Sequence, residues 1–174
     1  MSTKTKISPM KRKFVSADPD KCVGCGICEY ACSMSKEKLF NPLKSRIRVV
    51  RLHPLVNMSI TCRLCENPAC VAACPRDALK QSEENGTIIV DEEKCNGCGW
   101  CIEACDYGAI TLHPEKKVVF LCDLCKDKDK PQCIAWCPEE ALDLETSETL
   151  SQKARITAVK KLFQEAMQKT EEKK

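Results

Sequence analysis

The chain is poor in large apolar side chains. Leucine, isoleucine, valine and phenylalanine make up 37 of its 174 residues, and aromatic residues account for only 5%. This content lies near the limit below which hydrophobic burial alone no longer holds a domain together. The length allows one domain or two small ones, so a large enzyme with a deep apolar pocket is excluded.

Signals for export, membrane insertion and nucleotide binding are also absent. Residues 1–20 contain no apolar segment of the kind that directs secretion, and no run approaches the 18 or so apolar residues of a membrane span. We therefore expect a cytoplasmic protein without direct membrane insertion. The net charge of +3 is too small for a dedicated nucleic-acid binder. No P-loop or dinucleotide-binding glycine motif occurs in the sequence.

Cysteine is the residue type present in excess, with 16 residues in the sequence. The cysteines form four groups of four, and each group begins with C-x2-C and ends with C-x3-C. In sequence order these groups, called motifs 1 to 4, are Cys22, Cys25, Cys28 and Cys32; Cys62, Cys65, Cys70 and Cys74; Cys95, Cys98, Cys101 and Cys105; and Cys122, Cys125, Cys133 and Cys137. Without a secretion signal, this pattern indicates metal binding rather than disulfides.

The motifs repeat as pairs. Residues 18–32 align without gaps with residues 91–105, and residues 62–79 align with residues 122–142 after a three-residue insertion. A repeat of this kind indicates an internal duplication. The sequence therefore divides into a flexible basic extension at 1–13, a cysteine-rich domain at 14–146 with repeats 14–83 and 84–146, and a tail at 147–174.

Only short elements are predicted between the motifs. Apolar and charged residues alternate over residues 46–52, as is typical of a half-buried strand. Asn85-Gly86 predicts a hairpin turn before a strand at 87–90, and residues 113–116 predict a second hairpin. The end of each motif suits one or two helical turns. The expected fold class is α+β: a duplicated ferredoxin-like module with short hairpins and short helices around cysteine loops.

The tail differs from the rest of the sequence. Apolar residues at 156, 159, 162, 163, 166 and 167 fall on one face of a helix whose other face carries Lys and Glu. The sequence therefore predicts a C-terminal amphipathic helix. Two roles remain open for it: packing onto its own domain, or docking to another subunit.

The cysteine spacing suits iron–sulfur clusters. A [4Fe–4S] cube needs four thiolates, and C-x2-C-x2-C supplies three of them from one tight loop. Glycines such as Gly24 and Gly97 let the backbone pass close to the cube. The fourth cysteine lies on the following helix and ligates a different cluster, so motifs must work in pairs. The alternative is zinc, for which the cysteines would hold the loops of an interaction module.

Residues 14–146 resemble the four-cluster iron–sulfur subunits of multi-subunit oxidoreductases. This family includes the electron-transfer subunits of dimethyl-sulfoxide reductase, formate dehydrogenase, carbon-monoxide dehydrogenase, hydrogenase and aldehyde oxidoreductase-type complexes. The resemblance is carried by CRLCENPACVAACP in motif 2 and CDLCKDKDKPQCIAWCP in motif 4. In two places the sequence departs from a bacterial ferredoxin: Ser33 and Asp106 stand where proline would follow motifs 1 and 3.

The resemblance implies how the motifs pair, which the spacing alone leaves open. In that family the outer motifs pair with each other, and so do the inner motifs. The implied ligand sets for four [4Fe–4S] clusters are Cys22, Cys25, Cys28 and Cys137; Cys32, Cys122, Cys125 and Cys133; Cys62, Cys65, Cys70 and Cys105; and Cys74, Cys95, Cys98 and Cys101. Every cube then has four thiolates, which leaves no corner for substrate, and no catalytic residue is expected in this protein.

The resemblance implies an electron-transfer subunit that relays single electrons between a catalytic oxidoreductase subunit and an external donor or acceptor. The expected partner is a soluble tungsten or molybdenum enzyme of the aldehyde oxidoreductase type, a group that includes aromatic acyl-CoA reductases. A nickel carbon-monoxide dehydrogenase or hydrogenase, or a free polyferredoxin, is the alternative. A soluble ferredoxin is a further expected partner, and the oxygen sensitivity of such clusters suggests an anaerobe.

A few other residues carry expectations of their own. His53 and His113 each precede a proline and are expected at the surface or in a turn. Trp100 and Trp136 are expected to pack beside a cluster, and residues 126–130 to form a solvated charged loop.

Overall fold

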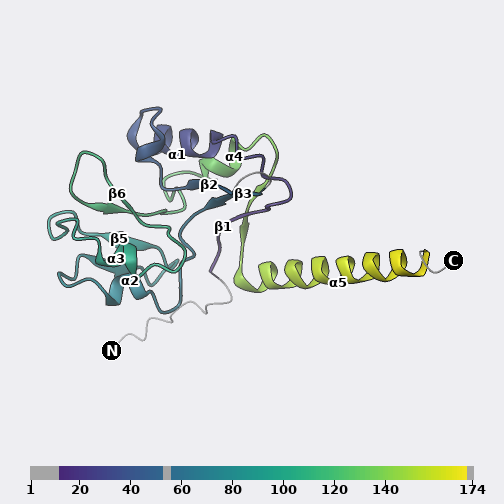
Figure 1. Ribbon diagram of the computed structural model, residues 1–174. Helices are drawn as coiled ribbons and strands as arrows, with labels where there is room; N and C mark the ends of the chain where they lie inside the picture. The colour runs from purple at the N-terminus through teal and green to yellow at the C-terminus, as the bar shows by residue number, and fades with distance from the viewer. Residues whose placement is uncertain (1–11, 53–55, 172–174) are drawn as a thin grey trace.

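Short strands and short helices alternate along the described part of the protein, which comprises residues 12–52 and 56–171 of this computed structural model (Figure 1). The elements are β1 (Phe14–Ala17), α1 (Ile27–Glu37), the 3-10 helix η2 (Pro42–Lys44), β2 (Arg48–Leu52), β3 (Val56–Ile60), α2 (Ala69–Ala72), β4 (Leu79–Gln81), β5 (Ile88–Val90), α3 (Trp100–Glu103), β6 (Thr111–Leu112), β7 (Val119–Phe120), α4 (Gln132–Ala135), β8 (Leu142–Glu145) and α5 (Ser147–Glu171). This arrangement confirms the α+β fold class.

The strands pair two by two in antiparallel sheets. Three of these sheets, β2–β3, β4–β5 and β6–β7, are hairpins between neighbouring strands. Both predicted hairpin turns are present. At the first, Gly86 has a φ of +77°, and the Asn85 side chain accepts a hydrogen bond from the Thr87 N–H at 3.0 Å. The predicted strand at residues 46–52 begins two residues later, at Arg48.

The fourth sheet joins the two ends of the cysteine-rich domain. Strand β1 pairs with β8, with Phe14 opposite Glu145 and Ala17 opposite Leu142. The pairing continues where the Asp18 N–H donates to the Ala141 carbonyl at 2.8 Å. The same bond recurs in the other half, from Asp91 to Ala78 at 2.8 Å, beside the β4–β5 sheet. The β1–β8 and β4–β5 sheets are therefore structural duplicates.

Two modules result, and each takes one motif from each sequence repeat. Helix α1 packs on α4, which brings motif 1 to motif 4, and α2 packs on α3, which brings motif 2 to motif 3 (Figure 1). Each module has its own buried cluster. One is built around Val15, Ile47 and Leu142, and the other around Leu64, Leu79 and Val119.

Helix α1 is the longest helix of the cysteine-rich domain, with 11 residues where α2, α3 and α4 have four each. Motifs 2 and 4 are followed by Pro75 and Pro138, and proline disfavours continuation of a helix. Ser33 follows motif 1 instead, and the helix continues. The Ser33 hydroxyl is buried, donates to the Tyr30 carbonyl at 3.1 Å and accepts from the Asn41 N–H at 3.2 Å.

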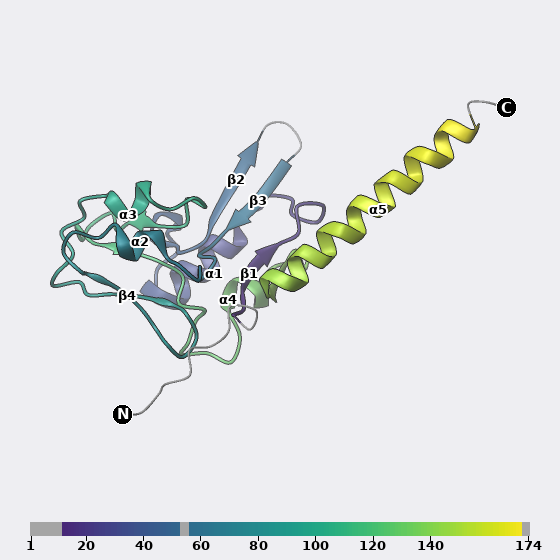
Figure 2. The ribbon, with the colours of Figure 1, turned by 90° about the horizontal axis from the view of Figure 1, so that it is seen from below.

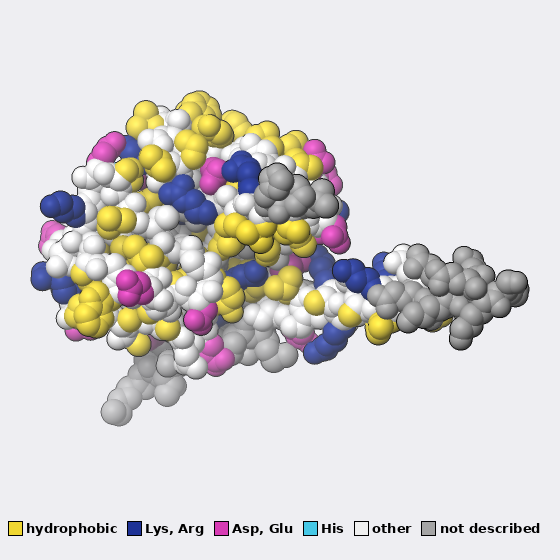
Figure 3. All heavy atoms as spheres, in the orientation of Figure 1, with side chains coloured by type: hydrophobic (Ala, Val, Ile, Leu, Met, Phe, Trp, Pro, Cys, Tyr) yellow, Lys and Arg dark blue, Asp and Glu magenta, His cyan; other side chains and the backbone are white. Residues whose placement is uncertain are grey.

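Helix α5 extends away from the cysteine-rich domain (Figures 1 and 2). Ile156, Val159, Leu162 and Phe163 are 51 to 70% exposed, and yellow apolar side chains are visible along it in Figure 3. Leu150 packs against the core and Lys153 pairs with Glu145, but the four exposed apolar side chains that follow on α5 do not pack onto the cysteine-rich domain. Across residues 12–52 and 56–171, no helix combines the length and the apolar character needed to cross a membrane.

Candidate metal centres

None of the sixteen cysteines is joined to another by a disulfide bond. The last two cysteines of each motif lie on or beside the helix that ends the motif, and most of the sixteen are buried or half-buried. Cys25 and Cys98 are the exceptions, since both are exposed. They occupy the same position in motifs 1 and 3.

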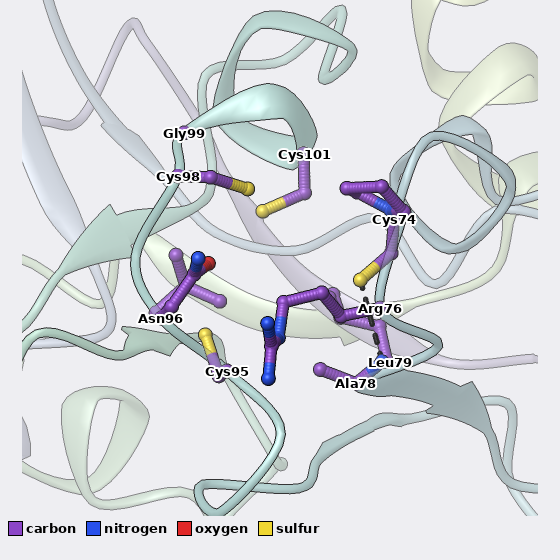
Figure 4. A pocket seen from close by; sticks show the side chains of 11 residues that line it. Cys74, Arg76, Ala78, Leu79, Cys95, Asn96, Cys98, Gly99 and Cys101 are labelled. Atoms are coloured by element: carbon purple, nitrogen blue, oxygen red, sulfur yellow. Dashed lines mark hydrogen bonds between the residues drawn. The ribbon is translucent and has the colours of Figure 1, made fainter.

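Cysteines from distant motifs line two small pockets. The first pocket is lined by four cysteines that we call site A: Cys22, Cys25, Cys28 and Cys137. The second is lined by four that we call site D: Cys74, Cys95, Cys98 and Cys101. Figure 4 shows the site D cysteines arranged around one space, with Cys74 approaching from the side opposite Cys98.

The remaining cysteines form two more deeply buried groups. Site B comprises Cys32, Cys122, Cys125 and Cys133. Burial raises the pKa of the Cys122 thiol to about 12, and nearby Cys32 adds to this rise. Burial also raises the pKa of Cys133 above its ordinary value, with further contributions from Cys122, Cys32 and Cys125.

Site C comprises Cys62, Cys65, Cys70 and Cys105. Burial raises the pKa of Cys70 to about 12, with added effects of Cys62 and Cys105, and raises the pKa of Cys62 to about 11. One cysteine raises the pKa of another only when the two lie close together, so these effects identify the cysteines that are neighbours. The structure thus groups motif 1 with motif 4 and motif 2 with motif 3.

The four sites adjoin one another in the order A, B, C, D. Cys28 of site A lies close enough to Cys133 of site B to affect its pKa. Cys62 of site C likewise acts on the pKa of Cys122 of site B. Sites C and D are joined by the packing of α2 on α3. The exposed Cys25 and Cys98 therefore lie in the two end sites.

Backbone N–H groups point at the fourth cysteine of every motif. Ala78 donates to Cys74 Sγ at 3.3 Å, Ala109 to Cys105 at 3.5 Å and Ala141 to Cys137 at 3.3 Å, each from four residues later. In motif 1 the donor to Cys32 is Arg46 at 3.3 Å, because the longer α1 carries the backbone away first.

This donor set fits an iron–sulfur cluster. Such clusters are held by thiolates, and hydrogen bonds to the sulfurs stabilise their negative charge. The buried thiols with raised pKa values need a positive partner before they can ionise, and iron supplies one. Within residues 12–52 and 56–171, no group of three or more His, Cys, Asp or Glu side chains is arranged to hold a single metal ion.

Two glycines of the cysteine loops lie where neighbouring residues leave no room for a side chain. Gly24 and Gly97 both have a φ of +70°. A Cβ on Gly24 would lie 2.6 Å from the Asn57 side-chain oxygen, and one on Gly97 would lie 2.7 Å from the Lys117 carbonyl oxygen. Each loop is therefore in close contact with the hairpin that follows it.

Several side chains around the sites were not predicted from the sequence. The Arg51 guanidinium donates to the Gly24 carbonyl at 2.6 and 3.0 Å and so braces the motif 1 loop. The buried Ser59 hydroxyl lies 3.5 Å from Cys28 Sγ. Lys36 and Arg46 both pair with Asp123, which is adjacent to Cys122. The sequence contained a signal for Ser59, since Ser59 and Val119 each stand three residues before the first cysteine of motifs 2 and 4 and yet differ in polarity.

The other sequence predictions have mixed outcomes. His113 lies in the β6–β7 turn, one of the two positions predicted for it, and its ring is buried, with Nδ1 accepting backbone N–H bonds from Glu115 and Lys116. His53 lies outside the described residues. Residues 126–130 are exposed, as expected. Trp100 and Trp136, which were expected to pack beside a cluster, are more than half exposed.

Comparisons with known proteins find iron–sulfur domains in this sequence. The 4Fe-4S dicluster domain family matches residues 55–147, and the 4Fe-4S binding domain family matches residues 15–33. The sequence is 41% identical over 133 residues to the polyferredoxin-like subunit of aliphatic sulfonate oxidoreductase from Pyrococcus furiosus, covering 76% of each protein.

Two relatives from Escherichia coli K12 are also similar. The electron transport protein HydN is 34% identical, covering 84% of this protein and 98% of HydN. A subunit of anaerobic dimethyl sulfoxide reductase is 32% identical, covering 78% of this protein and 74% of that subunit.

Among solved structures, the BamBC active site complex of benzoyl coenzyme A reductase with benzoyl-CoA matches at a TM-score of 0.47 and 23% identity, covering 83% of this protein and 89% of the matched subunit. The family matches and the sequence relatives span both modules. The protein therefore belongs to the family of ferredoxin-type electron-transfer subunits with 4Fe-4S binding domains.

Proposed function

We propose that the protein holds four [4Fe–4S] clusters, one in each of sites A to D, with the four cysteines of each site as ligands. The observation that carries this proposal is the position of two distant cysteines: Cys137 shares a pocket with the first three cysteines of motif 1, and Cys74 shares one with the first three of motif 3. Pairing of the motifs in sequence order would separate these residues.

A bound [4Fe–4S] cluster accepts and releases one electron at a time. The protein's own contribution is to present sulfur ligands, to donate backbone hydrogen bonds to them and to limit access of water. Sites B and C are the more buried, while sites A and D each include one exposed cysteine. The end sites are therefore where external redox partners can approach, and the buried sites connect them.

The protein serves, under this proposal, as the relay between a catalytic oxidoreductase subunit and an external donor or acceptor. Two relatives support this role, since one is named as a subunit of aliphatic sulfonate oxidoreductase and another belongs to anaerobic dimethyl sulfoxide reductase. We extend the proposal to a partner that carries tungsten or molybdenum, of the aldehyde oxidoreductase type. The alternative partner is a nickel enzyme, and metal analysis of the complex distinguishes it from a tungsten or molybdenum enzyme.

Anaerobic purification from the native host, followed by metal analysis of the complex, tests the proposal. Four filled sites correspond to about sixteen iron atoms per molecule. Tungsten or molybdenum in the same complex supports the proposed partner, while nickel overturns that part. Zinc with little iron would mean that the cysteines form a structural zinc module and that the cluster assignment is wrong.

A further inference from the structure

Sites A and D are duplicates within the repeat, and every residue that lines site D has a counterpart that lines site A. Each contains three cysteines of one loop, a fourth cysteine followed by proline, and an alanine four residues after that cysteine. The alanine N–H donates to the fourth sulfur at 3.3 Å in both sites. Both also have one exposed cysteine. A comparison of the two sites therefore isolates the few side chains that differ.

The linings differ in charge at one equivalent pair of positions. Glu139 lines site A directly after Pro138, and Arg76 lines site D directly after Pro75. In the described part of the protein, these are the charged residues that line the two pockets. The equivalent sites thus carry opposite charges.

Arg76 is held in place at site D. Its Nε donates to the Lys94 carbonyl at 2.5 Å, just before Cys95. Figure 4 shows the Arg76 side chain crossing the pocket between Cys95 and Cys74. Its guanidinium therefore lies at the exposed edge of the pocket, beside the loop that carries Cys95.

The other charges near the two sites are either matched or paired. Asp77, whose charge acts on Cys74 of site D, and Glu140 of site A are acidic residues at equivalent positions. At site A, Glu29 Oε2 and Arg51 Nη2 lie 3.4 and 3.5 Å from the Cβ position of Gly26, so these opposite charges share one location. At site D, Lys94 pairs with Asp91 and Lys116 with Glu92, both at 3.4 Å. Glu103 of α3 is exposed and does not line the pocket.

One uncharged difference between the linings favours reduction of a cluster at site A instead. Ser59 at site A lies where Val119 lies at site D, and its hydroxyl is 3.5 Å from Cys28 Sγ. A donor to sulfur stabilises the reduced cluster, because reduction adds negative charge. A single long hydrogen bond is nevertheless weaker than a reversal of charge from Glu139 to Arg76, even after screening by solvent.

We propose that a cluster in site D holds an electron more firmly than its duplicate in site A, because Arg76 stabilises the added negative charge where Glu139 opposes it. This inference rests on the proposed function, since it requires a cluster in both sites. The internal duplication thus supplies two similar sites, and one pair of side chains gives them different electron affinities.

Redox titration of the anaerobic holoprotein, followed by electron paramagnetic resonance, tests the inference. The signals of sites A and D are first assigned with Cys25→Ser and Cys98→Ser. We expect Arg76→Glu to decrease the ratio of reduced to oxidised cluster at site D by about threefold at a fixed potential. Glu139→Arg is expected to increase the ratio at site A by a similar factor. Glu148→Arg, a charge reversal at an exposed position on α5, is the matched control.

The outcomes separate the two proposals. A protein with about sixteen iron atoms in which site A is the stronger electron acceptor, or in which both variants match Glu148→Arg, overturns the inference and leaves the proposed function intact. A protein without iron–sulfur signals overturns the proposed function itself. Arg76→Gln and Glu139→Gln, which remove charge without reversing it, are expected to give about half of each change in free energy.

Discussion

Lys36 and Asp123 form an ion pair at 2.8 Å across 87 residues of sequence. The Lys36 side chain is only 9% exposed, and its ammonium group also contacts Asp127 at 2.6 Å. Arg46 reaches the same Asp123 oxygen at 3.2 Å, and its backbone N–H donates to Cys32 Sγ. This network ties α1 to the motif 4 loop and so holds Cys32 beside Cys122.

The network predicts the effect of removing Lys36. Lys36→Met keeps the aliphatic stem but leaves Asp123 with Arg46 as its remaining cation, so we expect a loss of about 1–2 kcal/mol of stability. Thermal unfolding of the anaerobic holoprotein measures this as a lower midpoint. Lys128→Met, at an exposed position in the same loop, is the control. Equal midpoints for the two variants would contradict the role of the network.

The proposed ligand sets predict how much iron is lost in single and in double cysteine variants. Cys22→Ser and Cys137→Ser should each empty or convert one cluster, and the double variant should affect that same cluster only. Cys22→Ser combined with Cys74→Ser should affect two clusters, because these residues belong to sites A and D. Iron and sulfide analysis distinguishes these results. Two clusters lost in the Cys22–Cys137 double variant would contradict the shared site.

Ser59 predicts a shift in one reduction potential. Ser59→Ala removes the hydroxyl beside Cys28 Sγ, so the cluster at site A should become harder to reduce, by less than the roughly threefold change in the ratio of reduced to oxidised cluster expected for Glu139→Arg. The matched variant is Val119→Ser, which introduces a hydroxyl at the equivalent position of site D. Potentiometric titration measures both. An unchanged site A potential in Ser59→Ala, with the cluster intact, would show that the hydroxyl does not act on this sulfur.

The glycine pair Gly97 and Gly108 predicts unequal effects of the same substitution. Both have positive φ, +70° and +59°, so alanine is strained at either position. At Gly97 the new Cβ would also lie 2.7 Å from the Lys117 carbonyl oxygen, whereas at the exposed Gly108 nothing lies within 4 Å. We expect Gly97→Ala to cost about 1–2 kcal/mol more than Gly108→Ala. Thermal unfolding that ranks the two variants equally would contradict the close contact.

The exposed face of α5 predicts tolerance of polar substitutions. Phe163 is 70% exposed, so Phe163→Ser should leave the unfolding midpoint of the isolated protein nearly unchanged. Ile47 is 1% exposed, and Ile47→Ala should cost about 2–4 kcal/mol because it leaves a cavity in the core. A large loss for Phe163→Ser would mean that α5 packs on the domain in solution.

Much of the local structure could be predicted from the sequence. The turn at Asn85-Gly86 and the helices that end each motif depend on neighbouring residues, and the structure contains them. The strand β3 was not predicted, because Val56–Ile60 becomes a strand only by pairing with β2. The burial of His113 could not be predicted either, since it depends on the packing of Phe120 at 5.6 Å and on backbone donors in its own turn.

The sequence by itself determined the chemistry of this protein: sixteen cysteines at cluster spacing, glycines where the loops turn, and prolines that end two helices. The tertiary structure decided which motifs meet. The β1–β8 ladder joins Phe14 to Glu145, and such pairing between distant segments has no local signal in the sequence. It also decided that Glu139 and Arg76 occupy equivalent sites, because the electrostatic effect of a side chain depends on its distance from a charge in space.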